Sequence, residues 1–158
     1  MDENHVVREN LIWLLRGGNA HVTIEKAVAN FPAEYYNSVP RNVGYSAWQI
    51  LEHMRRAQRD IRDFIINENY KPQEWPDEYW PKPDESADES RWQNTWQGFH
   101  SDLDSLIQMV EEGSTEFFSP LAHAPKYNIF REILLVADHN AYHLGQLVLL
   151  RKLLKIWP

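Results

Sequence analysis

The stretch that decides the fold is residues 129–154, which read IFREILLVADHNAYHLGQLVLLRKLL. Asn128 is a good helix N-cap, and apolar residues then recur on more than one face of a helix. A helix that is apolar all round is buried on both sides. We therefore expect a long helix with one side in the core and the other as a candidate contact with a second subunit.

Two further segments have clear helical patterns. Ser46 and Gln49 form a capping box, and apolar residues follow at three- and four-residue steps, which predicts a helix over residues 46–70. Ser86 and Glu89 form a second apparent capping box before the apolar seam of residues 92–110. A fourth helical pattern covers residues 6–30, where the glycine pair at 17 and 18 predicts either a kink or a break into two helices.

The connection over residues 71–85 contains four prolines, which exclude a helix there. It is also aromatic, so we expect an ordered connection with Trp75, Tyr79 and Trp80 packed on the helices. Fifteen extended residues span about 50 Å, whereas a 22-residue helix is about 33 Å long. The connection is therefore long enough to make the second and third helices parallel. No segment is clearly typical of a strand, so the predicted fold class is all-α, a four-helix bundle.

Composition excludes several classes of function. The chain of 158 residues has 16 Lys and Arg against 23 Asp and Glu, a formal net charge of −7, and no Cys. This acidic balance argues against a nucleic-acid surface, and the lack of Cys excludes disulfides, thiolate ligands and Cys nucleophiles. No secretory signal or membrane-spanning stretch is visible, so we expect a cytoplasmic protein with no membrane partner.

The strongest chemical signal is His139-Asn-Ala-Tyr-His143. Two histidines four residues apart lie on one helix face, where both imidazoles can bind one divalent ion. This spacing is common by chance, but here it lies in an apolar helix, and burying polar groups without partners costs about 1–3 kcal/mol each. A metal ion would compensate for both side chains at once.

His53 is the third candidate ligand, because it lies close to the apolar face of the 46–70 helix. It is either a boundary histidine with its hydrogen bonds satisfied or a ligand beside His139 and His143. Three protein ligands with open positions are typical of a catalytic rather than a structural site.

His21 and Gln146 are candidates for supporting roles. His21, just after the glycine pair, is an extra ligand, a general base or a core histidine. Gln146 follows His143 by three residues, so it could hydrogen-bond a ligand imidazole or the substrate.

Some well-known chemistries are missing from the sequence. There is no Glu-x-x-His, which disfavours a di-metal oxidase, and no His-Glu-x-x-His, which excludes the metalloprotease helix. A glycine-rich nucleotide loop is also absent.

Taken together, these motifs resemble the DinB superfamily of metal-binding helical proteins. The resemblance rests on an inward His53, a long crossover and a last helix with Asp138-His-Asn-Ala-Tyr-His-Leu-Gly-Gln-Leu147, and it extends over nearly the whole chain. It implies one bundle domain over residues 1–158, with up-down-down-up topology and a long crossover between the second and third helices. It also implies a homodimer and one divalent ion (zinc, nickel, iron or manganese) on His53, His139 and His143.

The resemblance gives two expectations for function. Some relatives are transferases or isomerases that use low-molecular-weight thiols, so the first expectation is a metal-dependent S-transferase or hydrolase acting on a small molecule. The alternative is a dimeric, non-catalytic metal-binding or stress-associated bundle. DNA binding is not implied, in agreement with the negative charge.

Overall fold

Side-chain caps fix the starts of the three longest helices in the computed structural model, which describes residues 3–158. Residues 1 and 2 of the expected domain lie outside the described residues. Helix α3 (Ala47–Ile66) begins at the predicted capping box: the Ser46 hydroxyl accepts from the backbone N–H of Gln49, whose side chain accepts from that of Ser46. Helix α5 (Ile129–Leu153) begins after Asn128, as predicted.

Helix α4 (Glu89–Glu111) begins later than predicted, because Asp88 and not Ser86 is its N-cap. The side-chain amide of Asn37 bonds both the backbone N–H and the carbonyl of Ala87, at 2.8 Å each. Asn37 thus holds Ala87 outside the first helical turn, and with Asp88 as the cap the expected capping box at Ser86 is wrong.

The glycine pair breaks the first predicted helix in two. Helix α1 (Glu3–Arg16) stops where Gly17 and Gly18 adopt φ values of 66° and 82°, a left-handed conformation that L side chains rarely adopt. Between α1 and α3 the chain is helical only in the short α2 (Ile24–Val28), capped by Thr23, and in the 3-10 turn η1 (Ala33–Tyr35).

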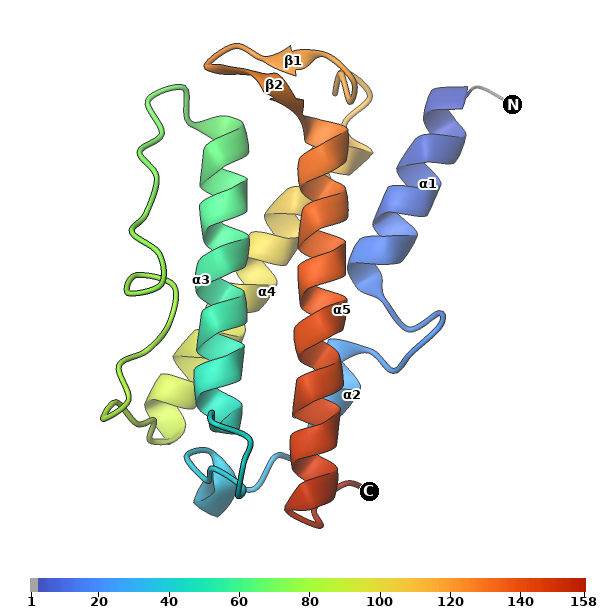
Figure 1. The fold of residues 1–158 in the computed structure, drawn as a ribbon. Helices are drawn as coiled ribbons and strands as arrows, with labels where there is room; N and C mark the ends of the chain where they lie inside the picture. Colours follow the sequence, from blue (N-terminus) through green and yellow to red (C-terminus); the bar gives the residue numbers. More distant parts are fainter. Residues whose placement is uncertain (1–2) are drawn as a thin grey trace.

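The four long helices form a bundle with up-down-down-up topology (Figure 1). Helices α3 and α4 run parallel, because residues 67–88 return along the whole length of α3 before α4 begins. Helices α1 and α5 run in the opposite direction. Both α3 and α1 pack against α4 and α5. The long crossover inferred from the sequence is thus confirmed.

The all-helical expectation missed a small antiparallel hairpin of β1 (Pro120–Leu121) and β2 (Ala124–Asn128). It lies over the end of α3, where the ring of Phe64 contacts His123 and Tyr127 (Figure 1). The strands are very short and contain Pro120 and Pro125, so they carry little strand signal. Proline is tolerated here because the hairpin has only two strands, both at an edge.

Buried polar side chains tie the middle of α3 to its neighbours. Gln58, only 1% exposed, accepts from the side chain of Asn140 on α5 and donates to the carbonyl of Phe99 on α4. The Glu52 carboxylate is bonded by Arg55 and Arg56 on its own helix and by Thr95 on α4. Gln58 thus ties α3 to both α4 and α5, and Glu52, next to His53, ties α3 to α4.

The outward side of α5 is apolar but uncovered: Leu134, Leu149 and Leu153 are all exposed. That this side meets a second subunit stays a prediction. Size-exclusion chromatography with light scattering would test it by measuring the mass of the protein in solution. None of the helices within residues 3–158 is both long and apolar enough to cross a membrane.

Replacing Ser46 by alanine tests how strongly the cap holds α3. Ser46→Ala removes one half of the capping box, so we expect the free energy of unfolding to fall by about 1 kcal/mol in a urea titration. Ser90→Ala, at an exposed position in α4, is the control and should leave stability unchanged or slightly raised. Equal stability of the Ser46 variant and the wild type would contradict this role.

Candidate metal centre

Three histidines from two helices converge on one point. His53 on α3 and His139 and His143 on α5 each offer a ring nitrogen, and these atoms all lie within 4.8 Å of one another. Nε2 of His139 is 3.1 Å from Nε2 of His53, and the ring centroids of His139 and His143 are 4.5 Å apart. His53 and His143 are 2% and 5% exposed, and His139 is half-buried. The structure thus brings together all three predicted ligands.

The ring of His53 is held on two sides by residues 67–88. Its Nδ1 is 3.0 Å from the carbonyl oxygen of Tyr79. Trp80 stacks on the ring with centroids 3.8 Å apart and planes 5° from parallel, and Tyr45 stacks in turn on Trp80. The crossover therefore sets both the position and the rotation of the imidazole.

The hydrogen-bond partners also select the tautomers. A carbonyl oxygen can only accept, so Nδ1 of His53 carries the proton and Nε2 keeps a lone pair. His143 follows the same pattern, because its Nδ1 is 2.7 Å from Oε1 of Gln146. Gln146 therefore takes the orienting position expected from the sequence. Both Nε2 lone pairs therefore face the point where the rings meet, and that of His53 accepts from Nε2 of His139 at 3.1 Å in the metal-free protein.

The three imidazoles are held in the neutral form. Burial, helped by the nearby His143 and Arg56 and opposed by the hydrogen bond to Tyr79, lowers the pKa of His53 to about 4. Burial, followed by the two neighbouring imidazoles, lowers the pKa of His139 to about 3. Burial also lowers the pKa of His143. Neutral imidazole is the form that binds metal, so no proton need be displaced near neutral pH.

A buried carboxylate holds Tyr79, the residue whose carbonyl contacts His53. Asp60, 8% exposed, accepts hydrogen bonds from the hydroxyls of Tyr79 at 2.6 Å and Tyr70 at 2.7 Å. Burial and these bonds raise the pKa of both tyrosines, that of Tyr70 to about 12, so both hydroxyls stay protonated donors. Asp60 thereby anchors the residue whose carbonyl orients His53.

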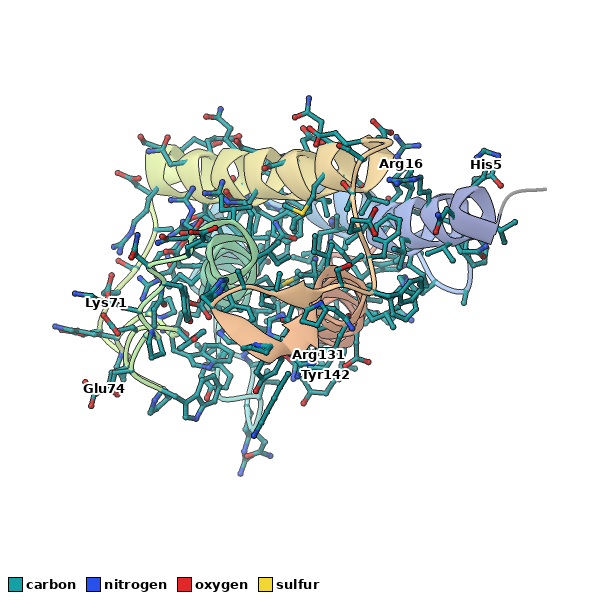
Figure 2. The ribbon with its side chains drawn as sticks, turned by 90° about the horizontal axis from the view of Figure 1, so that it is seen from above. His5, Arg16, Lys71, Glu74, Arg131 and Tyr142 are labelled. Atoms are coloured by element: carbon teal, nitrogen blue, oxygen red, sulfur yellow. The ribbon has the colours of Figure 1, made fainter. Side chains whose placement is uncertain are left out.

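A pocket of about 740 Å³ opens directly onto the three histidines. Figure 2 looks along the bundle and shows Tyr142, one of its lining residues, on the side of the molecule away from α4. Its walls come from α3, α5 and the crossover, and most of the lining is aromatic or aliphatic. The side chains that line it besides the histidines include Tyr45, Ile61, Trp75, Tyr79, Trp80, Leu135, Asp138, Tyr142 and Gln146.

His21 lies outside this centre. It is exposed, its Nδ1 is 2.8 Å from the carbonyl oxygen of Val22, and it lines a separate cavity of only about 30 Å³ between α1 and α5. It is therefore not a core histidine, and it is not one of the grouped ligands. The glycine-flanked loop after α1 directs it away from the histidine cluster.

The aromatic residues of the crossover differ in their packing. Tyr79 and Trp80 are half-buried against the bundle, as expected, but Trp75 is 67% exposed and meets His53 only edge-on, with centroids 6.4 Å apart. Sequence reasoning did not assign Tyr79, Trp80 or Asp60 to the site. The available signal was an aromatic, proline-rich connection following the helix that contains His53.

Comparison with known proteins agrees with this architecture. The DinB superfamily profile matches residues 19–147, most of the chain and all three histidines. The chain belongs to the DinB superfamily. Neither the comparison with curated proteins nor that with solved structures gave a match. The four-helix DinB bundle predicted from the sequence is confirmed, and within it the histidines form a cluster that could hold a metal ion.

The donor set of this DinB protein fits a divalent ion. Imidazole nitrogens that share one ion at about 2.0–2.1 Å lie roughly 3–4 Å apart. The Nε2 atoms of His53 and His139 are 3.1 Å apart, and all three ligand atoms lie within 4.8 Å of one another. His53 and His143 have Nδ1 acceptors of the kind that orient metal-binding histidines. The nitrogen ligands suit zinc, nickel or iron better than calcium or magnesium, which prefer oxygen.

The lowered pKa values predict how stability depends on pH without metal. An unfolded histidine has a pKa near 6.5, so between about pH 6.5 and 4 the unfolded chain binds protons that folded His53 and His139 do not. The free energy of unfolding should therefore fall as pH is lowered through this window. His139→Gln should flatten the slope, by up to about 1.4 kcal/mol per pH unit for one proton. Urea titrations in the presence of chelator at several pH values measure this slope. Identical slopes for the wild type and His139→Gln would contradict the buried neutral state of His139.

Proposed function

We propose that this DinB protein is a divalent-metal-dependent enzyme whose ion is held by His53, His139 and His143 and whose substrate is a small molecule in the adjoining pocket. The observation that carries the proposal is the convergence of three neutral imidazoles at the wall of a pocket of about 740 Å³. A structural site is closed by four protein ligands, whereas three ligands beside a pocket leave room for a reactant. An S-transfer with a low-molecular-weight thiol or a hydrolysis is the proposed class of reaction.

The ion would act as a Lewis acid and lower the pKa of a water or thiol that reaches it. The chain's own residues do the rest of the work. The Tyr79 carbonyl and Gln146 orient His53 and His143, and the stacked Trp80 stops the His53 ring from turning. The apolar pocket wall excludes water from the bound reactant, which strengthens electrostatic interactions there. Gln146 remains in the proposal as an orienting residue, and His21 does not.

Metal titration of the full chain tests the site. We expect one zinc ion per chain by calorimetry, and His143→Ala should abolish this stoichiometric binding because it removes one of three ligands. His21→Ala is the matched control: it removes a histidine outside the cluster, and we expect it to bind zinc like the wild type. Equal zinc binding by the wild type and His143→Ala would exclude the site.

Cobalt substitution tests whether the site is open. The pocket reaches the histidines, so a Co²⁺-loaded protein should change its visible spectrum when azide is added, because azide occupies a free position on the ion. An unchanged spectrum would indicate a closed site and favour the non-catalytic, metal-binding bundle. The same titration on His143→Ala shows whether the signal comes from this site.

A further inference from the structure

The pocket beside the histidines has two large aromatic rings that the protein leaves uncovered. Trp75 of the crossover is 67% exposed and Tyr142 of α5 is 66% exposed, although both line the pocket. Each ring is supported by a neighbour: Trp75 lies 5.4 Å from the ring of Tyr79, and Tyr142 lies 4.9 Å from the ring of His143. Supported but uncovered rings are apolar surface that a ligand can bury.

The charge of the lining selects against anions. Among the described residues, Asp60 and Asp138 line the pocket, whereas no Lys or Arg does. The nearby cation Arg56 is directed elsewhere, since it bonds the Glu52 carboxylate and the carbonyl of Trp80. A carboxylate or phosphate on a ligand would therefore lose its hydration without gaining a protein cation as partner.

Two of the polar groups in the lining are occupied by other contacts. Both oxygens of Asp60 accept tyrosine hydroxyls, and Oε1 of Gln146 is used by His143. The wall thus offers a ligand mainly aromatic and aliphatic contacts. An anionic ligand finds no protein cation in the metal-free pocket, and a cationic ligand would be repelled by a divalent ion on the three histidines. An uncharged molecule is penalised in neither state, so it is the class that fits best.

We propose that the pocket binds a small uncharged molecule with an aromatic group, which packs on Trp75 and Tyr142 while its reacting end faces the three histidines. The pocket volume of about 740 Å³ is within the usual range for a small-molecule site. This proposal rests on the proposed function for what the ligand meets at the histidines. The class of ligand follows from the lining alone, and so the two can fail separately.

Three probes with the same ring and different charge test the proposal: 2-naphthalenemethanol, 2-naphthoate and 2-naphthylmethylammonium. Each is titrated by calorimetry into the full chain, once with chelator and once with zinc. In the metal-free protein we expect the alcohol to bind at least about tenfold more tightly than the naphthoate. Zinc should weaken the binding of the ammonium probe, because the divalent ion repels its charge. If the metal-free protein bound the naphthoate as tightly as the alcohol, the proposal would be overturned.

Substitutions locate the binding. Trp75→Ala and Tyr142→Ala should each weaken the alcohol about three- to tenfold, as expected for loss of one aromatic contact. Trp13→Ala is the matched control, because Trp13 is 55% exposed on α1 and does not line the pocket. All three positions are exposed, and circular dichroism checks that each variant folds. Unchanged affinity in both pocket variants would place the probe elsewhere and overturn the proposal.

The same titrations separate this proposal from the proposed function. If zinc does not bind but the alcohol is still preferred and depends on Trp75 and Tyr142, then the metal site fails and the ligand class stands. If zinc binds with one ion per chain but naphthoate matches the alcohol without metal, the metal site stands and the ligand class fails.

Discussion

The hydrogen bond between Nδ1 of His53 and the carbonyl oxygen of Tyr79 is the contact on which the rest of the site depends. It joins a helix to a residue 26 positions later, so it exists only because residues 67–88 return along α3. The bond fixes the tautomer of His53, and the next residue, Trp80, fixes the plane of its ring. The long crossover is therefore a structural part of the candidate metal centre as well as a connection between parallel helices.

Burying the three imidazoles reduces the stability of the folded protein. Each must give up its solvation, and burial shifts all three pKa values downward, away from the charged form. Tyr79 and Gln146 satisfy two of the Nδ1 atoms, and the cluster's Nε2 atoms face one another. One proton between His53 and His139 satisfies these two Nε2 atoms in the metal-free protein, and a cation could replace it. The arrangement that costs stability is therefore the same one that could hold an ion.

The contacts that hold the helices together lie apart from the walls of the pocket. Helices α3 and α5 are tied together by Gln58 and Asn140, and α4 backs them through Glu52 and Thr95. The pocket beside the histidines is formed largely by the crossover and by the exposed side of α5, where Trp75 and Tyr142 are uncovered. Changes in these two surface segments could alter the ligand without disturbing the core, which is how one fold accommodates many functions.

Local sequence signals determined the helices. The capping box at Ser46, the cap at Asn128 and the glycine break after α1 are each decided within a few residues, so they were readable directly. Where a distant contact competes, local reasoning failed: Asn37 moves the start of α4, and the hairpin strands are too short to be recognised. The pairing of His139 with His143 is a property of one helix and needs no tertiary information.

The sequence by itself thus determined four helices, their long parallel crossover and a histidine pair with a third candidate. Only the tertiary structure decided that His53 joins the pair and His21 does not, because that depends on how α3 and α5 pack across sequence separations of 86 and 90 residues. It also decided which backbone carbonyl orients His53 and which rings stay uncovered. Such contacts depend on the path of a proline-rich loop, and no periodicity in the sequence specifies that path.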